Sequence, residues 1–246
     1  MSIKNFIRKL ILGYKCDSES FLNHHRQLGA RIGKRTKVFE PTKTVIDETR
    51  PFLIEIGDDV QITRGVTILT HGYDWSVLKG VYGEVLGSAG RVKIGNNVFI
   101  GMDTMILKGV TIGNNVIIGA KSVVNKDVPD NCVYAGNPAR FICTLDQYYE
   151  KRKAAQLKEA KAIYDNYIIS YGKEPDPVVF GEFFWLFHRR TEPLLNEFKR
   201  RIDLVGNGDL SLRIFKEQES LFDGYEAFLE YLKNTTVEQC TNDLRG

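Results

Sequence analysis

The stretch that decides the fold runs from Ile94 to Val124 and reads IGNNVFIGMDTMILKGVTIGNNVIIGAKSVV. An aliphatic residue recurs at every sixth position, and glycine follows four of these aliphatic residues directly. The aliphatic positions are Ile94, Ile100, Ile106, Ile112, Ile118 and Val124. A step of six fits neither a helix nor an alternating strand. It predicts short flat strands joined by corners, three strands to a coil, with the aliphatic side chains stacked inside a parallel β-solenoid.

The same step continues upstream of this stretch. Ile56, Ile62 and Ile68 keep the phase, and weaker repeats begin near residue 32. Glycine and asparagine fill the corners, as in Gly95, Asn96 and Asn97, and we expect unusual backbone angles there. Chance spacing in a β-sandwich does not account for two blocks in one phase.

Three further motifs resemble the hexapeptide-repeat acyltransferases. GVTIGNNVIIGA ends at Ala120, YAGNPAR ends at Arg140, and GVTILTH ends at His71. The last motif is similar to the maltose, galactoside and capsular-polysaccharide O-acetyltransferase branch. The resemblance implies a left-handed parallel β-helix, acetyl-CoA as acyl donor, and a homotrimer whose active sites lie between subunits. A γ-type carbonic anhydrase shares this fold but needs three histidine ligands for zinc, and the solenoid has a single histidine.

The repeats divide the chain into three parts. We expect a short N-terminal helical arm over 1–30, the β-helix over 31–143 and an α-helical C-terminal extension over 144–246. Asp17 is placed as the N-cap of a helix that ends before Gly29. In the extension, helical patterns run over about 146–170, 178–189, 192–204 and 210–233. Its run of phenylalanines between Phe180 and Phe187 is interpreted as core.

Composition restricts the partners. With 34 basic and 31 acidic residues, the net charge of +3 does not favour nucleic acid as the main partner. The four scattered cysteines, Cys240 among them, indicate reduced thiols in a cytoplasmic protein. Neither a signal peptide nor a transmembrane segment is expected, and no metal site. Residues 1–43 hold ten basic and three acidic residues, which suits either a solvated helical face or attraction to an anionic surface or substrate.

His71 is the candidate catalytic residue. It stands where the repeat is interrupted, and about twenty residues, Gly72 to Arg91, pass before the register returns near residue 92. A neutral imidazole can take a proton from a hydroxyl and return one to a thiolate. The resemblance gives the histidine that ends GVTILTH this general-base role. His24, His25 and His188 are interpreted as structural or solvated.

The acceptor site is less defined by the sequence. Asp47, Tyr73, Asp74 and Trp75 are the predicted acceptor-binding residues, the two aromatic rings being suited to stacking on a sugar. Either a carboxylate or a backbone carbonyl could orient His71. With about eighteen residues to a coil, the position beside His71 on the neighbouring coil is expected near residue 53.

The donor site follows from the resemblance, in which the Ile-Gly-Ala step and the Asn-Lys pair after it line the coenzyme A groove. This carries over onto the cofactor-binding candidates Gly101, Gly119, Ala120, Asn125, Lys126 and Arg140. Lys126 and Arg140 are suited to the nucleotide phosphates.

Together these features predict an acetyl-CoA-dependent O-acetyltransferase acting on a hydroxyl of a sugar or polysaccharide in a ternary complex. Two alternatives stay open: an N-acetyltransferase of an amino sugar or drug, and a non-catalytic β-helix scaffold. Replacement of His71 tests the second alternative.

Overall fold

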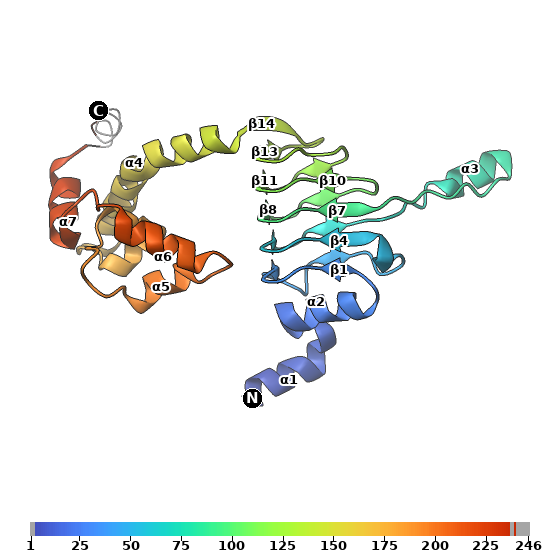
Figure 1. The fold of residues 1–246 in the computed structure, drawn as a ribbon, viewed down its shortest axis with the longest axis horizontal. Coiled ribbons are helices and arrows are strands. Elements are labelled where there is room, and N and C mark those ends of the chain that lie inside the picture. The colour runs from blue at the N-terminus through green and yellow to red at the C-terminus, as the bar shows by residue number, and fades with distance from the viewer. Residues whose placement is uncertain (1–2, 237–238, 240–246) are drawn as a thin grey trace. The chain divides into compact units, whose positions relative to one another are not determined.

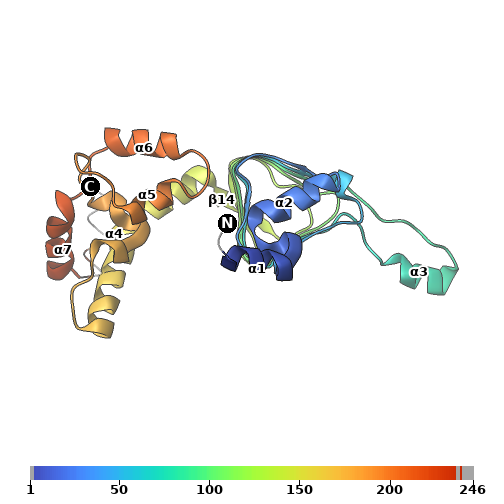
Figure 2. The same ribbon diagram turned by 90° about the horizontal axis from the view of Figure 1, so that it is seen from below.

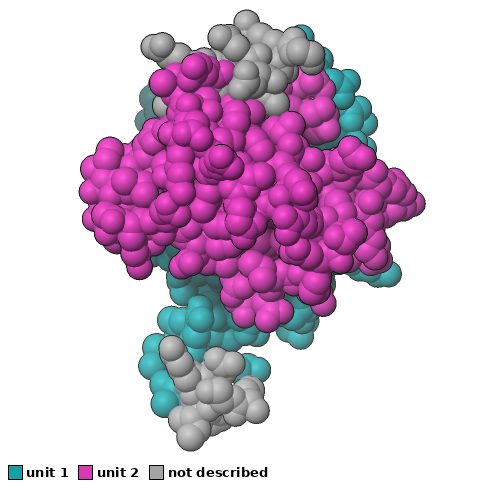
Figure 3. Space-filling view, turned by 90° about the vertical axis from the view of Figure 1, so that its left-hand side faces the viewer, with its two compact units in different colours: residues 1–148 teal, residues 149–246 magenta. Residues whose placement is uncertain are grey.

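The computed structural model describes residues 3–236 and residue 239, with the side chains from residue 7 onward. Cys240 lies outside the described residues, as do Met1 and Ser2. The chain divides into two compact units, Met1–Tyr148 and Tyr149–Gly246, which Figure 3 distinguishes by colour. Each unit is described by itself.

Short strands, stacked coil upon coil in three sheets, build the first unit (Figure 1). Sheet A has the order β1-β4-β7-β10, sheet B has β2-β5-β8-β11-β13-β14, and sheet C has β3-β6-β9-β12. The strands are β1 (Arg31–Ile32), β2 (Lys37–Val38), β3 (Val45–Ile46), β4 (Ile54–Ile56), β5 (Gln61–Ile62), β6 (Thr67–Ile68), β7 (Val92–Ile94), β8 (Val98–Ile100), β9 (Met105–Ile106), β10 (Thr111–Ile112), β11 (Val116–Ile118), β12 (Val123–Val124), β13 (Cys132–Ala135) and β14 (Arg140–Thr144). Because every third strand from β1 to β12 joins the same sheet, the chain winds as a parallel β-helix, as the step of six predicts. Among the strands of the described residues, β14 alone pairs antiparallel, against β13.

The sixfold step determines the register. In sheet C, Ile68 pairs with Ile106 and Ile106 pairs with Val124, so that side chains from successive coils stack in one column. Each of the three is at most 1% exposed. Full burial of an aliphatic side chain stabilises a fold by roughly 1.5–3 kcal/mol. The repeat therefore supplies the core of this unit.

The corners use asparagine and glycine for different reasons. Asn97 and Asn115 adopt positive φ values of 54° and 56°, and their side-chain amides stack through a hydrogen bond of 2.9 Å. Gly95 has an ordinary φ, which differs from the expectation of unusual angles. Instead it provides space, because a Cβ there would lie 2.6 Å from the carbonyl oxygen of Gly113 on the next coil.

The N-terminal arm closes one end of the β-helix. It comprises α1 (Ile3–Leu12), η1 (Gly13–Cys16) and α2 (Ser18–Gln27). The Asp17 side chain caps α2 by accepting a hydrogen bond of 2.8 Å from the Ser20 N–H, which confirms the predicted cap. Figure 2 shows α2 lying across the end of the stacked coils, where Phe21 and Leu22 are buried in the core.

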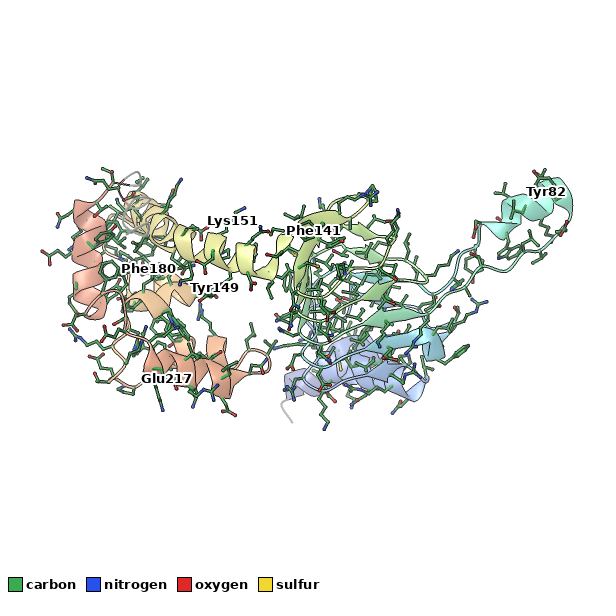
Figure 4. All side chains as sticks on the ribbon, turned by 45° about the horizontal axis from the view of Figure 1, so that its top comes forward. Tyr82, Phe141, Tyr149, Lys151, Phe180 and Glu217 are labelled. Atoms are coloured by element: carbon green, nitrogen blue, oxygen red, sulfur yellow. The ribbon has the colours of Figure 1, made fainter. Side chains whose placement is uncertain are left out.

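The interruption after His71 is an excursion that carries α3 (Trp75–Tyr82). None of the residues of α3 is buried, and Tyr82 lies at its far end (Figure 4). The chain returns through an antiparallel bridge between Ala89 and His71, and β7 restores the register at Val92 as predicted. The short helix η2 (Pro51–Leu53) interrupts an earlier coil.

Helices make up the second unit, although α4 begins just before it. They are α4 (Leu145–Tyr171), η3 (Pro177–Leu186), α5 (Asn196–Ile202), α6 (Gly208–Glu217) and α7 (Gly224–Asn234). Phe180, which Figure 4 labels, is buried in its core together with Phe184 and Phe187, so the interpretation of this run is confirmed. The helix expected over 210–233 is instead two helices. The one expected over 178–189 is a 3-10 segment, which bends at Gly181 with φ of 53°. None of the helices described here is long and apolar enough to cross a membrane.

Candidate active site

His71 and Asp47 come together because their strands are neighbours in sheet C. Ile46 at the end of β3 pairs with Ile68 at the end of β6, and both segments of the chain then leave the sheet at the same edge. The Asp47 N–H donates to the Ile68 carbonyl at 3.0 Å, which holds the two segments side by side beyond the strands. Sheet register therefore places the carboxylate beside the imidazole.

The Asp47 carboxylate is fully engaged within the chain. Its Oδ2 lies 2.6 Å from His71 Nδ1 and accepts hydrogen bonds from the Thr70 N–H and hydroxyl at 2.9 and 2.5 Å. Its Oδ1 accepts hydrogen bonds from the Thr49 N–H and hydroxyl at 2.9 and 2.6 Å. The Asp47 side chain is 3% exposed and that of His71 is 11% exposed.

These hydrogen bonds determine which nitrogen of His71 carries the proton. Burial alone would raise the pKa of Asp47, but hydrogen bonds from Thr49 and Thr70 outweigh it and hold the pKa well below its usual range. The ionised carboxylate only accepts hydrogen bonds, so Nδ1 of His71 must donate to it. Thr49 Oγ1, 3.0 Å from Nδ1, is a second acceptor. In the neutral imidazole the proton therefore lies on Nδ1, and Nε2 is the nitrogen that can accept a proton.

A cavity of about 340 Å³ adjoins this pair. Its lining residues are Tyr14, Lys15, Phe21, His25, Thr44, Val45, Ile46, Asp47, Glu48, Leu69 and His71. The volume lies within the range of about 300–1,000 Å³ that is typical of small-molecule sites. His71 and Asp47 therefore lie at the wall of a ligand-sized cavity.

The predicted acceptor residues are only partly brought together. Tyr73 places its ring edge-on to His71, with centroids 4.9 Å apart, and the Trp75 ring lies 6.4 Å from that of Tyr73. Tyr73, Asp74 and Trp75 do not line the cavity, and Tyr73 and Asp74 are exposed. Asp47 does line it, but the hydrogen bonds that it accepts already occupy its carboxylate. The geometry thus fits Asp47 as the partner of His71 better than as a ligand for an acceptor.

The predicted donor residues fall on two edges of the β-helix. Gly101, Gly119 and Ala120 lie where the chain turns from sheet B to sheet C, stacked so closely that a Cβ on Gly101 would lie 2.4 Å from the Ala120 nitrogen. Asn125 and Lys126 lie where the chain turns from sheet C to sheet A, the edge that His71 also occupies.

Along that second edge, the register of β6, β9 and β12 places Lys126 two coils from the Thr70–His71 step. At about 4.8 Å per coil, the separation is about 10 Å. Arg140 opens β14 at the end of sheet B and donates to the Ala139 carbonyl. Five of the six donor residues therefore flank sheet C on both sides, and Arg140 lies beyond them in sheet B.

Several residues at the site escape sequence reasoning. Thr49 and Thr70 hold Asp47, and the only signal for them is their closeness in sequence to Asp47 and His71. The expectation of residue 53 beside His71 is wrong, because the coil from Val45 to its partner Thr67 is longer than eighteen residues and contains η2. His25 lines the cavity, although the sequence suggests no role there beyond structure or solvation.

Comparisons with known proteins agree with the sequence motifs. Residues 91–126 match the family described as bacterial transferase hexapeptide (six repeats). Protein CapG of Staphylococcus aureus is 45% identical over 126 residues, which are 51% of this chain and 72% of CapG. Galactoside O-acetyltransferase of Escherichia coli (strain K12) is 41% identical over 109 residues, 43% of this chain and 51% of that enzyme.

Among solved structures, a maltose O-acetyltransferase from Clostridium difficile 630 matches with 31% identity and a TM-score of 0.37. The match covers 52% of this chain and 75% of that one.

Proposed function

Because this chain belongs to the bacterial transferase hexapeptide family and is an acyltransferase, we propose that it moves an acetyl group from acetyl-CoA to a hydroxyl of a sugar or polysaccharide. The observation that carries the proposal is the Asp47–His71 pair beside a ligand-sized cavity. Its relatives include a galactoside O-acetyltransferase, which favours a carbohydrate hydroxyl as acceptor.

In the proposed mechanism, His71 acts as general base in a ternary complex. Its Nε2 takes the proton of the acceptor hydroxyl while the oxygen attacks the thioester carbonyl carbon. Asp47, hydrogen-bonded to Nδ1, stabilises the imidazolium ion that forms. The tetrahedral intermediate then collapses: the carbon–sulfur bond breaks, the imidazolium returns its proton to the departing thiolate, and the acetyl ester and free coenzyme A leave.

The donor is proposed to lie along the edges of sheet C. The small residues Gly101, Gly119 and Ala120 leave room for the thin pantetheine arm beside the backbone. Asn125 offers an exposed amide, and Lys126 and Arg140 offer exposed cations to the nucleotide phosphates. Lys126 shares the edge of His71, which supports a donor that reaches the base along that edge.

The acceptor is proposed to meet His71 between the cavity and the start of the excursion. Tyr73 and Trp75 supply aromatic faces on which a sugar ring can stack, and Asp74 supplies a carboxylate for its hydroxyls. Asp47 is assigned to orienting His71 in place of its predicted acceptor role.

We further propose a homotrimer with active sites shared between subunits, each using His71 of one subunit and part of the donor groove of its neighbour. The outer faces of sheets B and C support it, because they expose Val45, Phe99 and Met105. The outer face of sheet A instead carries Arg31, Glu55 and Lys93 in register and ion-paired, which suits contact with solvent.

The test is release of free thiol from acetyl-CoA in the presence of methyl galactoside, maltose, an oligosaccharide or an amino sugar. We expect turnover with the hydroxyl acceptors. The product should be cleaved by base and by hydroxylamine, because both reagents cleave an ester. His71→Ala should lower kcat by about 10²–10⁴-fold, the contribution of a positioned general base. Unchanged turnover in His71→Ala would refute His71 as the general base, whereas a wild type that releases no thiol with any acceptor would favour a scaffold. Acetylation of the amino sugar alone, as an amide, would favour the N-acetyltransferase alternative.

A further inference from the structure

The N-terminal arm supplies one wall of the cavity beside His71. Tyr14 comes from η1 and His25 from α2, while Glu48 follows Asp47 on the coil that leaves sheet C. The arm thus closes the end of the β-helix and also brings polar groups to the reacting base.

His25 is the least expected of these groups. Its side chain is 1% exposed, and neither ring nitrogen has a hydrogen-bond partner in the described part of the chain. Its ring packs edge-on against Phe21 with centroids 4.6 Å apart. Burial lowers the pKa of His25 to about 4, so the ring is neutral at pH 7. A buried unpaired imidazole costs stability, which calls for a compensating role.

The chemistry of this ring suits a hydroxyl group. A neutral imidazole has one N–H donor and one nitrogen acceptor, and a hydroxyl both donates and accepts. A cation could donate only to the unprotonated nitrogen, and a carboxylate could accept only from the N–H. Hydroxyl groups can bond to either nitrogen. The unpaired ring therefore favours an alcohol as its partner.

Glu48 adds a carboxylate with free capacity at the same wall. Its Oε1 accepts a hydrogen bond of 2.9 Å from the Tyr14 hydroxyl, and His25 Nε2 lies 4.0 Å from that oxygen. His24 Nε2 lies 3.3 Å from it, without the alignment of a hydrogen bond. Among the described residues Oε2 has no hydrogen-bond partner, and the side chain is 45% exposed.

The rest of the lining is largely apolar, with Phe21, Ile46 and Leu69 among its residues. Apolar surface can pack against the C–H faces of a sugar ring, while a few placed polar groups select its hydroxyls. Asp47 on the same lining is bonded to His71, so Glu48 is the carboxylate left for a ligand.

We propose that this cavity is the acceptor subsite and that His25 and Glu48 recognise hydroxyl groups of one sugar ring seated beside His71. The proposal rests on the proposed O-acetyltransferase function. It places acceptor recognition on the N-terminal arm, in addition to the excursion residues Tyr73 and Trp75.

Two substitutions test it, with the sugar of the panel above that the wild type acetylates fastest. Glu48→Gln keeps the size of the side chain but removes its charge. We expect the KM for the sugar to rise about 10-fold or more, as expected for loss of a charge-assisted hydrogen bond. The KM for acetyl-CoA should stay at the wild-type value.

His25→Phe keeps the ring that packs on Phe21 and removes both unpaired nitrogens. We expect a severalfold rise in the KM for the sugar, while thermal unfolding occurs at the same or a higher temperature. A purely structural His25 would leave the KM for the sugar unchanged.

Glu55→Gln is the matched control, because Glu55 is ion-paired on the outer face of sheet A and does not line the cavity. It should leave both KM values unchanged. The subsite would be overturned if both Glu48→Gln and His25→Phe kept the wild-type KM for the sugar. If His71→Ala still lost activity as expected, the proposed function would stand. If no sugar of the panel is acetylated, the proposed function fails and the subsite with it.

Discussion

At the scale of single residues, the hydrogen bonds around Asp47 matter more than its charge alone. Thr49 and Thr70 each donate two hydrogen bonds to it, which fixes the position of both carboxylate oxygens. The carboxylate in turn holds Nδ1 of His71, so that a neutral ring carries its proton on that nitrogen. An imidazole without this partner could rotate or carry its proton on the wrong nitrogen.

Asp47→Asn tests this arrangement through activity. The amide can present an N–H to His71 Nδ1, which favours the wrong tautomer, and it cannot stabilise the imidazolium ion. We expect kcat to fall by about 100-fold or more in the thiol-release assay. Asp58→Asn is the control, since Asp58 accepts a hydrogen bond from Lys34 at a corner away from His71 and should keep wild-type activity.

The effect of Asp47→Asn on the free energy of unfolding should depend on pH. Because the pKa of Asp47 is lower in the folded state, the unfolded chain binds more protons and stability rises with pH. The contribution is fully present above the unfolded pKa of about 4 and is lost as the pH falls toward the folded pKa. Urea unfolding should therefore find Asp47→Asn less stable than wild type by about 1–3 kcal/mol at pH 7, with a smaller difference below pH 4. A difference that does not vary with pH would contradict the ionised state of Asp47.

At the scale of elements, the corners impose a steric rule on the coils. Gly95 sits under the backbone of Gly113, and Gly119 faces the Ala135 side chain at a distance where a Cβ would lie 2.7 Å away. Coils can stack at the spacing of paired strands only if such positions lack a side chain. The glycines therefore mark close approach between coils.

Gly95→Ala should destabilise the protein by about 1–3 kcal/mol, because its Cβ would press on backbone atoms that cannot move independently. Gly80→Ala is the matched control, since Gly80 lies in α3 with no atom within 4 Å of an added Cβ. Alanine there should be neutral or stabilise α3 by up to about 1 kcal/mol. Thermal or urea unfolding measures both variants, and equal effects would refute the steric explanation.

At the scale of the whole molecule, the outer faces of sheets A and C differ in chemistry. Sheet A presents an ion-paired ladder, while sheet C presents Val45, Thr67, Met105 and Val123 in register along its outer side. Charged ladders are costly to bury, whereas exposed apolar side chains favour association. Sheet C also separates the two groups of predicted donor residues, which suits a shared site.

Sedimentation equilibrium should therefore give a mass of about three times the 28.0 kDa of one chain. Met105→Lys, which adds a charge to the outer face of sheet C, should lower this mass and the thiol-release rate together. Lys93→Gln on sheet A should change neither. A monomer with full activity would rule out sites shared between subunits.

The helices of the second unit follow only in part from the sequence. Its long first helix and aromatic core follow from apolar spacing and from the end of the glycine step. The break between α6 and α7 does not follow from the apolar spacing, because apolar residues such as Leu221 and Phe222 continue through it. Local pattern does not reveal where such a chain turns back to close a core.

The sequence by itself determined the β-helix, the return of its register at Val92 and the position of His71 at its interruption. These follow from a local rule, since every repeat must bury the same side chain at the same step. Only the tertiary structure decided the partners of His71. The coil that holds Asp47 is longer than the eighteen residues of a regular coil, so counting residues misplaces the contact by several positions. Likewise His25 reaches the cavity only because α2 folds across the end of the coils, a long-range contact that no local spacing encodes.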